Sequence, residues 1–330
     1  MSGGEVRQRI CHIARALDQP SVDGVNSYFV SLAARSAVTV AISGTGGDEL
    51  FAGYPSFIKM KLHVKDNGNA SLTGAMRGKL SDLVNKPSFD RLVFLRGGWR
   101  IARLREESFL NQYGSINTVF HTNLATKLTA PHLRKTAQAG RSFHQDCIQI
   151  DELPTADVIE RTSALCLRGY TNSQLLRDID AVSMSHSLEV RVPFLDPVIT
   201  DIAMSLPDHA KLGSLSDFSS YGEAVAGSYR ATGAKRILLD IGKKFLPADF
   251  DLTPKRGFGM PFGDWLRGPL HDVLEDTLSV DATRQRGLLD PAAVTAVKNN
   301  FQNSSGPWYE PWVLMMLELW GREVLDRSST

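Results

Sequence analysis

Residues 43–49 form a glycine-rich turn directly after a short apolar run, and their types could bind an anion. Small residues let the backbone approach a ligand closely. Successive amides in such a turn can hold an anion, and a helix that follows adds the partial positive charge of its N-terminus. Asp48 stands where a carboxylate could hold Mg²⁺ beside that anion. A plain strand-to-helix turn capped by Asp48 has the same composition, so both interpretations stay open.

A second group of polar residues lies between residues 180 and 196. Glu189 and Arg191 are separated by one residue and stand just before Pro193. Both side chains could line a ligand site. A Glu–Arg ion pair that fastens a helix end to the following Pro-Phe-Leu stretch explains the same residues without any ligand.

A third segment, residues 253–264, is rich in glycine and proline and contains Lys255. A lysine beside glycines on a flexible loop can swing onto a phosphate as a point charge. Lys255 is therefore a candidate cation for a bound phosphate. A solvent-exposed basic turn is the alternative.

The composition narrows the classes of protein that these segments can serve. The chain has 330 residues, of which 37 are basic and 36 acidic, so its formal charge is +1. That balance does not suggest a nucleic-acid-binding protein, which usually has a clear basic excess. No apolar run is long enough to span a membrane, and the N-terminus does not resemble a signal peptide. The three cysteines are far apart, and we expect reduced core thiols in a cytoplasmic protein.

The elements that position these segments are predicted to be mostly helices. Apolar spacing predicts helices over 5–18, 26–36 and 311–326, several helices within 88–150, and one leading into residues 183–184. Asp290 followed by Pro291 is a typical helix start. The run 38–42 is rich in β-branched residues and predicts a buried parallel strand, the one convincing strand of the chain. Residues 213–233 are expected to be loose.

Taken in order, the three segments resemble the synthetase half of glutamine-dependent asparagine synthetases. That family has the pattern S-G-x-G-x-D-E-x-F-x-G-Y, and residues 43–54 read S-G-T-G-G-D-E-L-F-A-G-Y. The family's D-x-x-S-M stretch matches the residues that begin at Asp180, and its E-x-R-x-P-F-L-D stretch matches residues 189–196. Its K-x-x-F-x-x-P loop matches the residues that begin at Lys255. The resemblance runs from about residue 10 to 325.

The resemblance implies an α/β, mainly helical fold of the adenine-nucleotide-hydrolase (ATP pyrophosphatase) type that lacks its first strands. Residues 1–62 are then the remnant of a nucleotide-binding sheet and 63–87 a mobile linker. Residues 88–330 form the helical part with the catalytic loop 253–264. The family's glutaminase domain is absent from this chain. An incomplete sheet would expose an apolar edge, so we expect the chain to self-associate or to need the missing part.

The resemblance also implies a reaction. Mg²⁺-ATP would adenylate a carboxylate, typically that of aspartate, pyrophosphate would leave, and ammonia derived from glutamine would attack the acyl-adenylate. Lys255 would be the cation facing pyrophosphate and Asp48 the Mg²⁺ ligand. By the same resemblance, the other catalytic residues would be Glu189, Arg191 and Thr45. The residues that bind the nucleotide would be Ser43, Gly44, Gly46, Gly47 and Asp180.

Two departures from the family pattern keep other functions open. The family's pyrophosphate loop, S-G-G-x-D-S, lies well upstream of the turn, whereas only 42 residues precede Ser43 here. Thr45 occupies a position where asparagine synthetases usually have an acidic residue. The alternatives are therefore an enzyme that forms another amide, such as a β-lactam, a macrolactam or an amidated sugar acid, and a non-catalytic remnant or scaffold.

Overall fold

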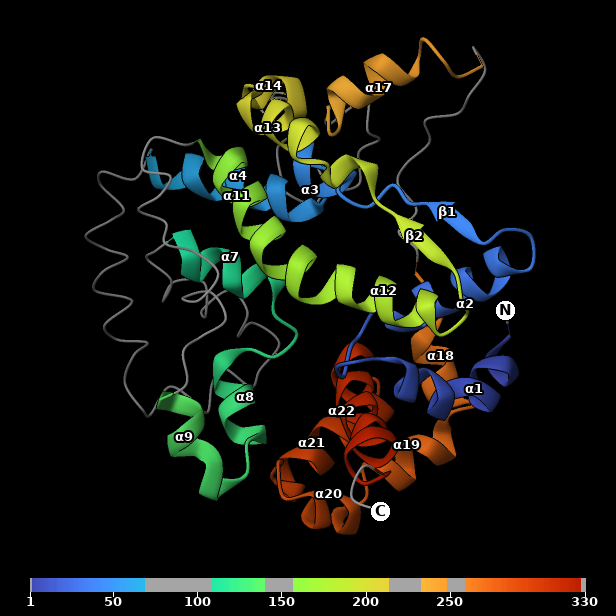
Figure 1. The fold of residues 1–330 in the computed structure, drawn as a ribbon. Coiled ribbons are helices and arrows are strands. Elements are labelled where there is room, and N and C mark those ends of the chain that lie inside the picture. Colours follow the sequence, from blue (N-terminus) through green and yellow to red (C-terminus); the bar gives the residue numbers. More distant parts are fainter. Residues whose placement is uncertain (1, 69–108, 140–156, 214–232, 248–258, 328–330) are drawn as a thin grey trace.

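The computed structural model describes residues 2–68, 109–139, 157–213, 233–247 and 259–327. This part of the chain is mainly helical, as the sequence predicts (Figure 1). Its helices and strands are α1 (Gly3–Ala16), α2 (Gly24–Arg35), β1 (Val40–Ile42), α3 (Gly47–Leu50), α4 (Pro55–Gly68), α7 (Phe109–Asn117), α8 (Thr122–Leu128), α9 (Arg134–Ala139), α11 (Val158–Cys166), α12 (Leu176–Met184), β2 (Glu189–Arg191), α13 (Pro197–Ser205), α14 (Asp208–Lys211), α17 (Arg236–Gly242), α18 (Phe262–Arg267), α19 (His271–Thr277), α20 (Val280–Arg286), α21 (Pro291–Gln302) and α22 (Tyr309–Trp320).

Shorter helical segments link or extend these elements. A π-helical stretch, Leu167–Leu175, joins α11 to α12, and another, Gly321–Leu325, continues α22. Single 3₁₀ turns lie at Pro131–Leu133 and Pro193–Leu195. The mobile linker predicted over 63–87 is wrong for its first residues, because α4 continues to Gly68, and residues 69–87 lie outside the described residues.

The sheet consists of β1 and β2, which run parallel with Val40 opposite Glu189 and Ile42 opposite Arg191. The parallel direction of β1 is confirmed, but its predicted burial is wrong. Val40 is 40 % exposed and Ile42 78 % exposed. An apolar run indicates a strand that is suited to burial, whereas burial itself requires neighbours, and the described part of the chain pairs β1 only with β2. The sequence also missed β2, which is a strand of three residues.

The main hydrophobic core lies in what we call the C-terminal helical region, formed by α1 and by residues 262–325, and buried residues of α2, α8 and α12 pack into the same core. Trp312 is fully buried there and packs edge-on against Phe262, with ring centroids 4.6 Å apart. Phe262 also stacks on Trp308. Figure 1 shows α1 beside α22 although they lie at opposite ends of the sequence. The helix predicted over 311–326 is confirmed by α22 and its π-helical continuation, and so is the helix start at Asp290, whose side chain accepts from two backbone amides.

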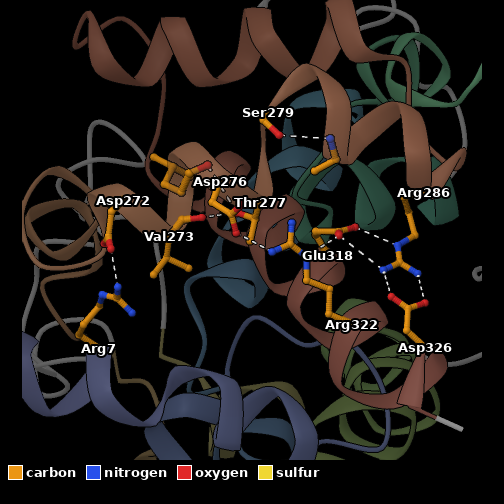
Figure 2. A network of polar contacts seen from close by, with 12 residues as sticks. Arg7, Asp272, Val273, Asp276, Thr277, Ser279, Arg286, Glu318, Arg322 and Asp326 are labelled. Carbon is orange, nitrogen blue, oxygen red and sulfur yellow. Dashed lines mark hydrogen bonds and ion pairs between the residues drawn. The ribbon is translucent and has the colours of Figure 1, made fainter. Parts of the chain in front are cut away.

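A network of ion pairs covers this core (Figure 2). The Glu318 carboxylate accepts from Arg286 Nε at 2.9 Å and from Arg322 Nε at 2.8 Å. Arg286 also forms a two-pronged pair with Asp326, with both distances 2.8 Å. These hydrogen bonds raise the pKa of the Arg286 guanidinium above its ordinary value. Gly321 lies close to this network: an added Cβ would lie 2.8 Å from the Arg286 guanidinium carbon, so a larger residue there would displace that side chain.

The cysteine prediction holds only in part. Cys166 is a buried free thiol, whereas Cys11 is a free thiol on an exposed helix face. Cys147 lies outside the described residues. In the part of the chain that the structure describes, no helix is both long enough and apolar enough to cross a membrane.

Candidate functional site

The turn between β1 and α3 is held by hydrogen bonds of its own. Ser43 Oγ lies 2.8 Å from Thr45 Oγ1 and accepts from the Thr45 N–H at 3.2 Å. The Gly46 N–H donates to Glu49 Oε2 at 2.9 Å, and the Gly47 N–H donates to the Gly44 carbonyl at 3.1 Å. Three successive amides are thus used inside the turn. In this conformation these three amides already have acceptors, so anion binding by a row of amides stays a prediction.

The glycines of the turn have different roles. Gly46 has a φ of +100°, and an added Cβ would lie 2.7 Å from a methyl carbon of Leu195. This position therefore requires glycine for both backbone conformation and packing. Gly44 is exposed, and an added Cβ would meet nothing within 4 Å. The open side of the turn, where a ligand can approach the backbone, is therefore at Gly44.

A buried carboxylate fixes the other side of the turn. Glu49 is 1 % exposed and accepts from Gly46 and, at 2.7 Å, from the Tyr54 hydroxyl. Tyr54 packs edge-on against Tyr170, whose hydroxyl donates to Asp23 at 2.9 Å. Burial raises the pKa of both phenols above the ordinary value, so they remain donors. The helix start is Gly46 rather than Asp48, which leaves the Asp48 side chain available for other contacts.

Asp48 pairs with a lysine that the sequence did not single out. Lys235 Nζ lies 2.9 Å from Asp48 Oδ1, and both side chains are about one-fifth to one-quarter exposed. Lys235 has a φ of +54°, which is uncommon for a residue with a side chain, and its N–H donates to the Phe51 carbonyl at 3.1 Å. Gly53 makes room for the pair, because an added Cβ would lie 2.0 Å from the Asp48 carboxylate.

The second sequence segment reaches the turn through the sheet. The Ser43 N–H donates to the Arg191 carbonyl at 2.8 Å, so the end of β2 adjoins the start of the turn. Arg191 Nε and Glu189 Oε1 are 2.8 Å apart, and both side chains are more than half exposed. The ion pair predicted as the plain alternative is therefore present, although it lies along β2 rather than at a helix end. Asp180 is exposed on α12.

Lys255 lies outside the described residues, and of the predicted loop 253–264 the structure describes only residues 259–264, the last three of which begin α18. Lys235, Glu49 and Tyr54 are the site residues that sequence reasoning missed. Glu49 had a signal, since a glutamate three residues after a helix start often accepts from the backbone there. No local pattern marks Lys235, which meets Asp48 only through folding of distant parts of the chain.

The oxygen atoms of the turn are of the kind that Mg²⁺ uses. This ion commonly binds one or two carboxylates, water and the phosphate oxygens of a substrate. Asp48 supplies one carboxylate, with the Ser43 and Thr45 hydroxyls nearby in sequence. Among the described residues there is no cluster of three or more acidic, histidine or cysteine side chains that could hold a metal alone. The oxygen atoms of the turn therefore fit a metal ion whose remaining ligands are phosphate oxygens of a bound substrate.

The sequence of the chain can now be compared with known families. The sequence profile of the asparagine synthase family matches residues 1–322. The chain belongs to the asparagine synthase family. No solved structure was found to match it.

Curated relatives within this family are considerably longer than the chain. Proteins of Mycobacterium tuberculosis H37Rv and Mycobacterium bovis, both named as glutamine-hydrolyzing asparagine synthetases, are 28 % identical to it over 337 residues. That match covers 99 % of the chain and 46 % of each relative. Glutamine-hydrolyzing asparagine synthetase 1 of Bacillus subtilis strain 168 is 27 % identical over 302 residues, covering 86 % of the chain and 40 % of the relative. The chain thus spans less than half the length of these relatives.

Proposed function

We propose that the turn 43–49 and its neighbours are the nucleotide side of an ATP-dependent, amide-forming ligase. The observation that carries the proposal is the open, glycine-lined turn beside a lysine–aspartate pair, in a chain of the asparagine synthase family. The fold we assign is that of an ATP pyrophosphatase. We assign the protein to the cytoplasm.

In the proposed reaction, an oxygen of the substrate carboxylate attacks the α-phosphorus of ATP and pyrophosphate leaves. Ammonia then attacks the acyl carbon, AMP departs with the carboxylate oxygen, and the nitrogen loses a proton. Mg²⁺, when bound, neutralises charge on the phosphates. A glutaminase domain in a longer form of the protein would supply the ammonia.

We assign each residue of the site a role according to its position. Gly44 leaves room for the nucleotide at the backbone, and Ser43, Gly46, Gly47 and Asp180 complete the nucleotide side of the site. Asp48 would hold the metal together with phosphate oxygens, and Lys235, whose Nζ lies 2.9 Å from the Asp48 carboxylate, would stabilise phosphate charge. Lys255 approaches the departing pyrophosphate from the loop 253–264. Loss of one preorganised charge contact of this kind lowers a rate by roughly 10²–10³.

Aspartate is the substrate that we propose first. Glu189 and Arg191 would orient it from the end of β2, where the Ser43 amide joins the strand to the turn. Thr45 keeps a second substrate class under consideration. Its hydroxyl pairs with Ser43 at 2.8 Å and gives the turn no charge at this position, which suits a carboxylate substrate without an α-amino group. Formation of a lactam or of an amidated sugar acid is therefore the alternative.

Pyrophosphate release from Mg²⁺-ATP tests the proposal, measured on the folded 330-residue chain with ammonia and either aspartate or other carboxylates. Release that needs ATP and aspartate, and that Lys255→Ala abolishes without unfolding the chain, supports the full assignment. Release that needs a different carboxylate supports the ligase and replaces the substrate.

Mg²⁺-ATP binding, measured by calorimetry on the same sample, separates the remaining outcomes. Binding without release favours the non-catalytic remnant. A folded chain that neither binds Mg²⁺-ATP nor releases pyrophosphate contradicts the proposal.

A further inference from the structure

Two tyrosines connect the candidate nucleotide turn with a carboxylate at the start of another helix. The Tyr54 hydroxyl donates to Glu49 Oε1 at 2.7 Å, and Glu49 Oε2 accepts from the Gly46 N–H at 2.9 Å. Tyr170 packs edge-on against Tyr54, with ring centroids 6.2 Å apart, and its hydroxyl donates to Asp23 Oδ2 at 2.9 Å. The Gly46 amide is therefore linked to Asp23 through a continuous series of side chains.

The segment that carries Tyr170 has an uncommon backbone. Residues Leu167–Leu175 are π-helical, a conformation that is rare and frequently occurs at functional sites. Gln174 in the same segment donates from Nε2 to Asp23 Oδ2 at 3.2 Å, so this oxygen atom accepts from both side chains. The π-helical segment also lies in contact with α3, the helix that follows the turn. Tyr170 is thus anchored at its hydroxyl and packed against Tyr54 at its ring.

The two carboxylates of this series accept from neutral donors. Glu49 is 1 % exposed and accepts from an amide and a hydroxyl, as Asp23 does. Burial raises the pKa of Asp23, and the hydrogen bond from Tyr170 opposes that shift. A buried carboxylate that loses such a donor keeps a charge that nothing compensates, which costs more than the hydrogen bond contributes. Both hydroxyls are therefore held firmly where they stand.

The same contacts join the segments on both sides of the turn. Asp23 lies at the start of α2, which leads into β1, whereas Tyr54 follows α3. Tyr170 comes from a distant part of the sequence and contacts both side chains. The turn 43–49, which lies between these two segments, is thus restrained from both sides.

We propose that Tyr170, anchored by Asp23, is a positioning residue for the turn 43–49. It holds Tyr54 in place, and thereby the Glu49 carboxylate that fixes the Gly46 amide. A binding site is effective only when neighbouring groups hold its atoms in the productive geometry. The consequence for nucleotide binding rests on the proposed function, whereas the positioning of the turn does not.

Hydrogen exchange of single amides in the ligand-free chain tests the positioning. Tyr170→Phe removes the hydroxyl anchor and keeps the ring. It is expected to speed exchange of the Gly46 amide about tenfold or more relative to the Leu319 amide in α22, which reports global unfolding. Tyr28→Phe is the matched control, because it removes a buried hydroxyl that is hydrogen-bonded to His12 Nδ1 at 2.9 Å, away from the turn. The relative exchange rate of Gly46 should not change in the control.

A double-mutant cycle tests whether Tyr170 acts through Tyr54. Tyr54→Phe removes the hydroxyl that donates to Glu49, and it is expected to speed exchange of the Gly46 amide at least as much as Tyr170→Phe does. The variant with both changes is expected to resemble Tyr54→Phe, because residues that act in series have effects that do not add.

The affinity for Mg²⁺-ATP, measured by calorimetry on the same variants, tests the consequence for the proposed site. The Kd is expected to rise about fivefold or more in Tyr170→Phe and to stay unchanged in Tyr28→Phe, because a loosened turn must be ordered again on binding.

Three results overturn the proposal. These are exchange of Gly46 in Tyr170→Phe that changes only as much as that of Leu319, additive effects of the two tyrosine changes, and a Kd for Mg²⁺-ATP that stays unchanged although Gly46 exchanges faster. The exchange measurements use no ATP. A wild-type chain that does not bind Mg²⁺-ATP therefore contradicts the proposed function, while the exchange of Gly46 still decides whether Tyr170 positions the turn.

Discussion

The C-terminal helical region buries its large apolar side chains, whereas the two-stranded sheet exposes them. Trp312 and its neighbours are buried under an ion-pair network, whereas Ile42 is largely exposed on a strand with an open edge. Both regions contain large apolar side chains, so the hydrophobicity of their residues does not distinguish them. The difference is the number of neighbours that each element finds within the described residues. Stability is therefore concentrated in one region and the candidate chemistry in the other.

The largest expected effect is on the buried side of this comparison. Trp312→Ala is expected to lower the free energy of unfolding by about 3–5 kcal/mol, because it removes a large side chain from a packed core. Ile42→Ala is the matched control and should change it by less than about 0.5 kcal/mol. Urea denaturation followed by circular dichroism measures both. Similar losses in the two variants would show that the regions do not differ in packing.

The ion pairs provide a second contrast. Glu318→Gln is expected to cost about 2 kcal/mol, because it leaves Arg286 and Arg322 near a neutral amide in a site with little solvent. Glu189→Gln removes a partner of Arg191 in an exposed pair and should cost about 0–1 kcal/mol. The same denaturation measurement applies, and equal costs would contradict the assignment of stability to the C-terminal helical region.

Two glycines sharpen the comparison within the turn. Gly46→Ala is expected to cost about 2 kcal/mol of stability, since it combines a φ of +100° with a clash against Leu195. Gly44→Ala should leave stability within about 0.5 kcal/mol and still weaken Mg²⁺-ATP binding, because its Cβ occupies the open side of the turn. Calorimetric titration of the folded variants measures the binding. Unchanged affinity in Gly44→Ala would remove Gly44 from the nucleotide site.

The smallest effect concerns pH. Burial raises the pKa of the Asp178 carboxyl to about 7, whereas an unfolded aspartate titrates near 3.9. The folded state then binds more protons than the unfolded state in this range, so stability falls as pH rises. We expect a loss of about 1 kcal/mol between pH 6 and pH 7 that is absent in Asp178→Asn. An identical pH profile for wild type and variant would show that Asp178 does not titrate there.

Local patterns predicted what local forces decide. Asp290 and Pro291 begin a helix because their effects on capping and on φ act within a few residues. The strand at Val40–Ile42 was found for the same reason, since a β-branched run favours extended backbone. Its burial was predicted wrongly, because burial depends on strands and helices elsewhere in the chain or beyond it.

The candidate site shows the same limit. The glycine-rich turn was recognised from its sequence, but the hydrogen bond of the Gly46 amide depends on Glu49, whose burial no local pattern reveals. Lys235 lies far along the chain from Asp48, and only the fold brings the two together. Roles for Lys255, Asp180 and Glu189 stay predictions.

Native-state hydrogen exchange of the isolated chain tests most directly whether the two regions differ as described. The amides of Ile13 in α1 and Leu319 in α22 are expected to exchange only with a free energy close to that of global unfolding. The outward amide of Ile42 is expected to exchange orders of magnitude faster in the same sample. Protection of Ile42 comparable to that of Leu319 in the monomeric chain would contradict the account, because the edge of β1 would then already be covered.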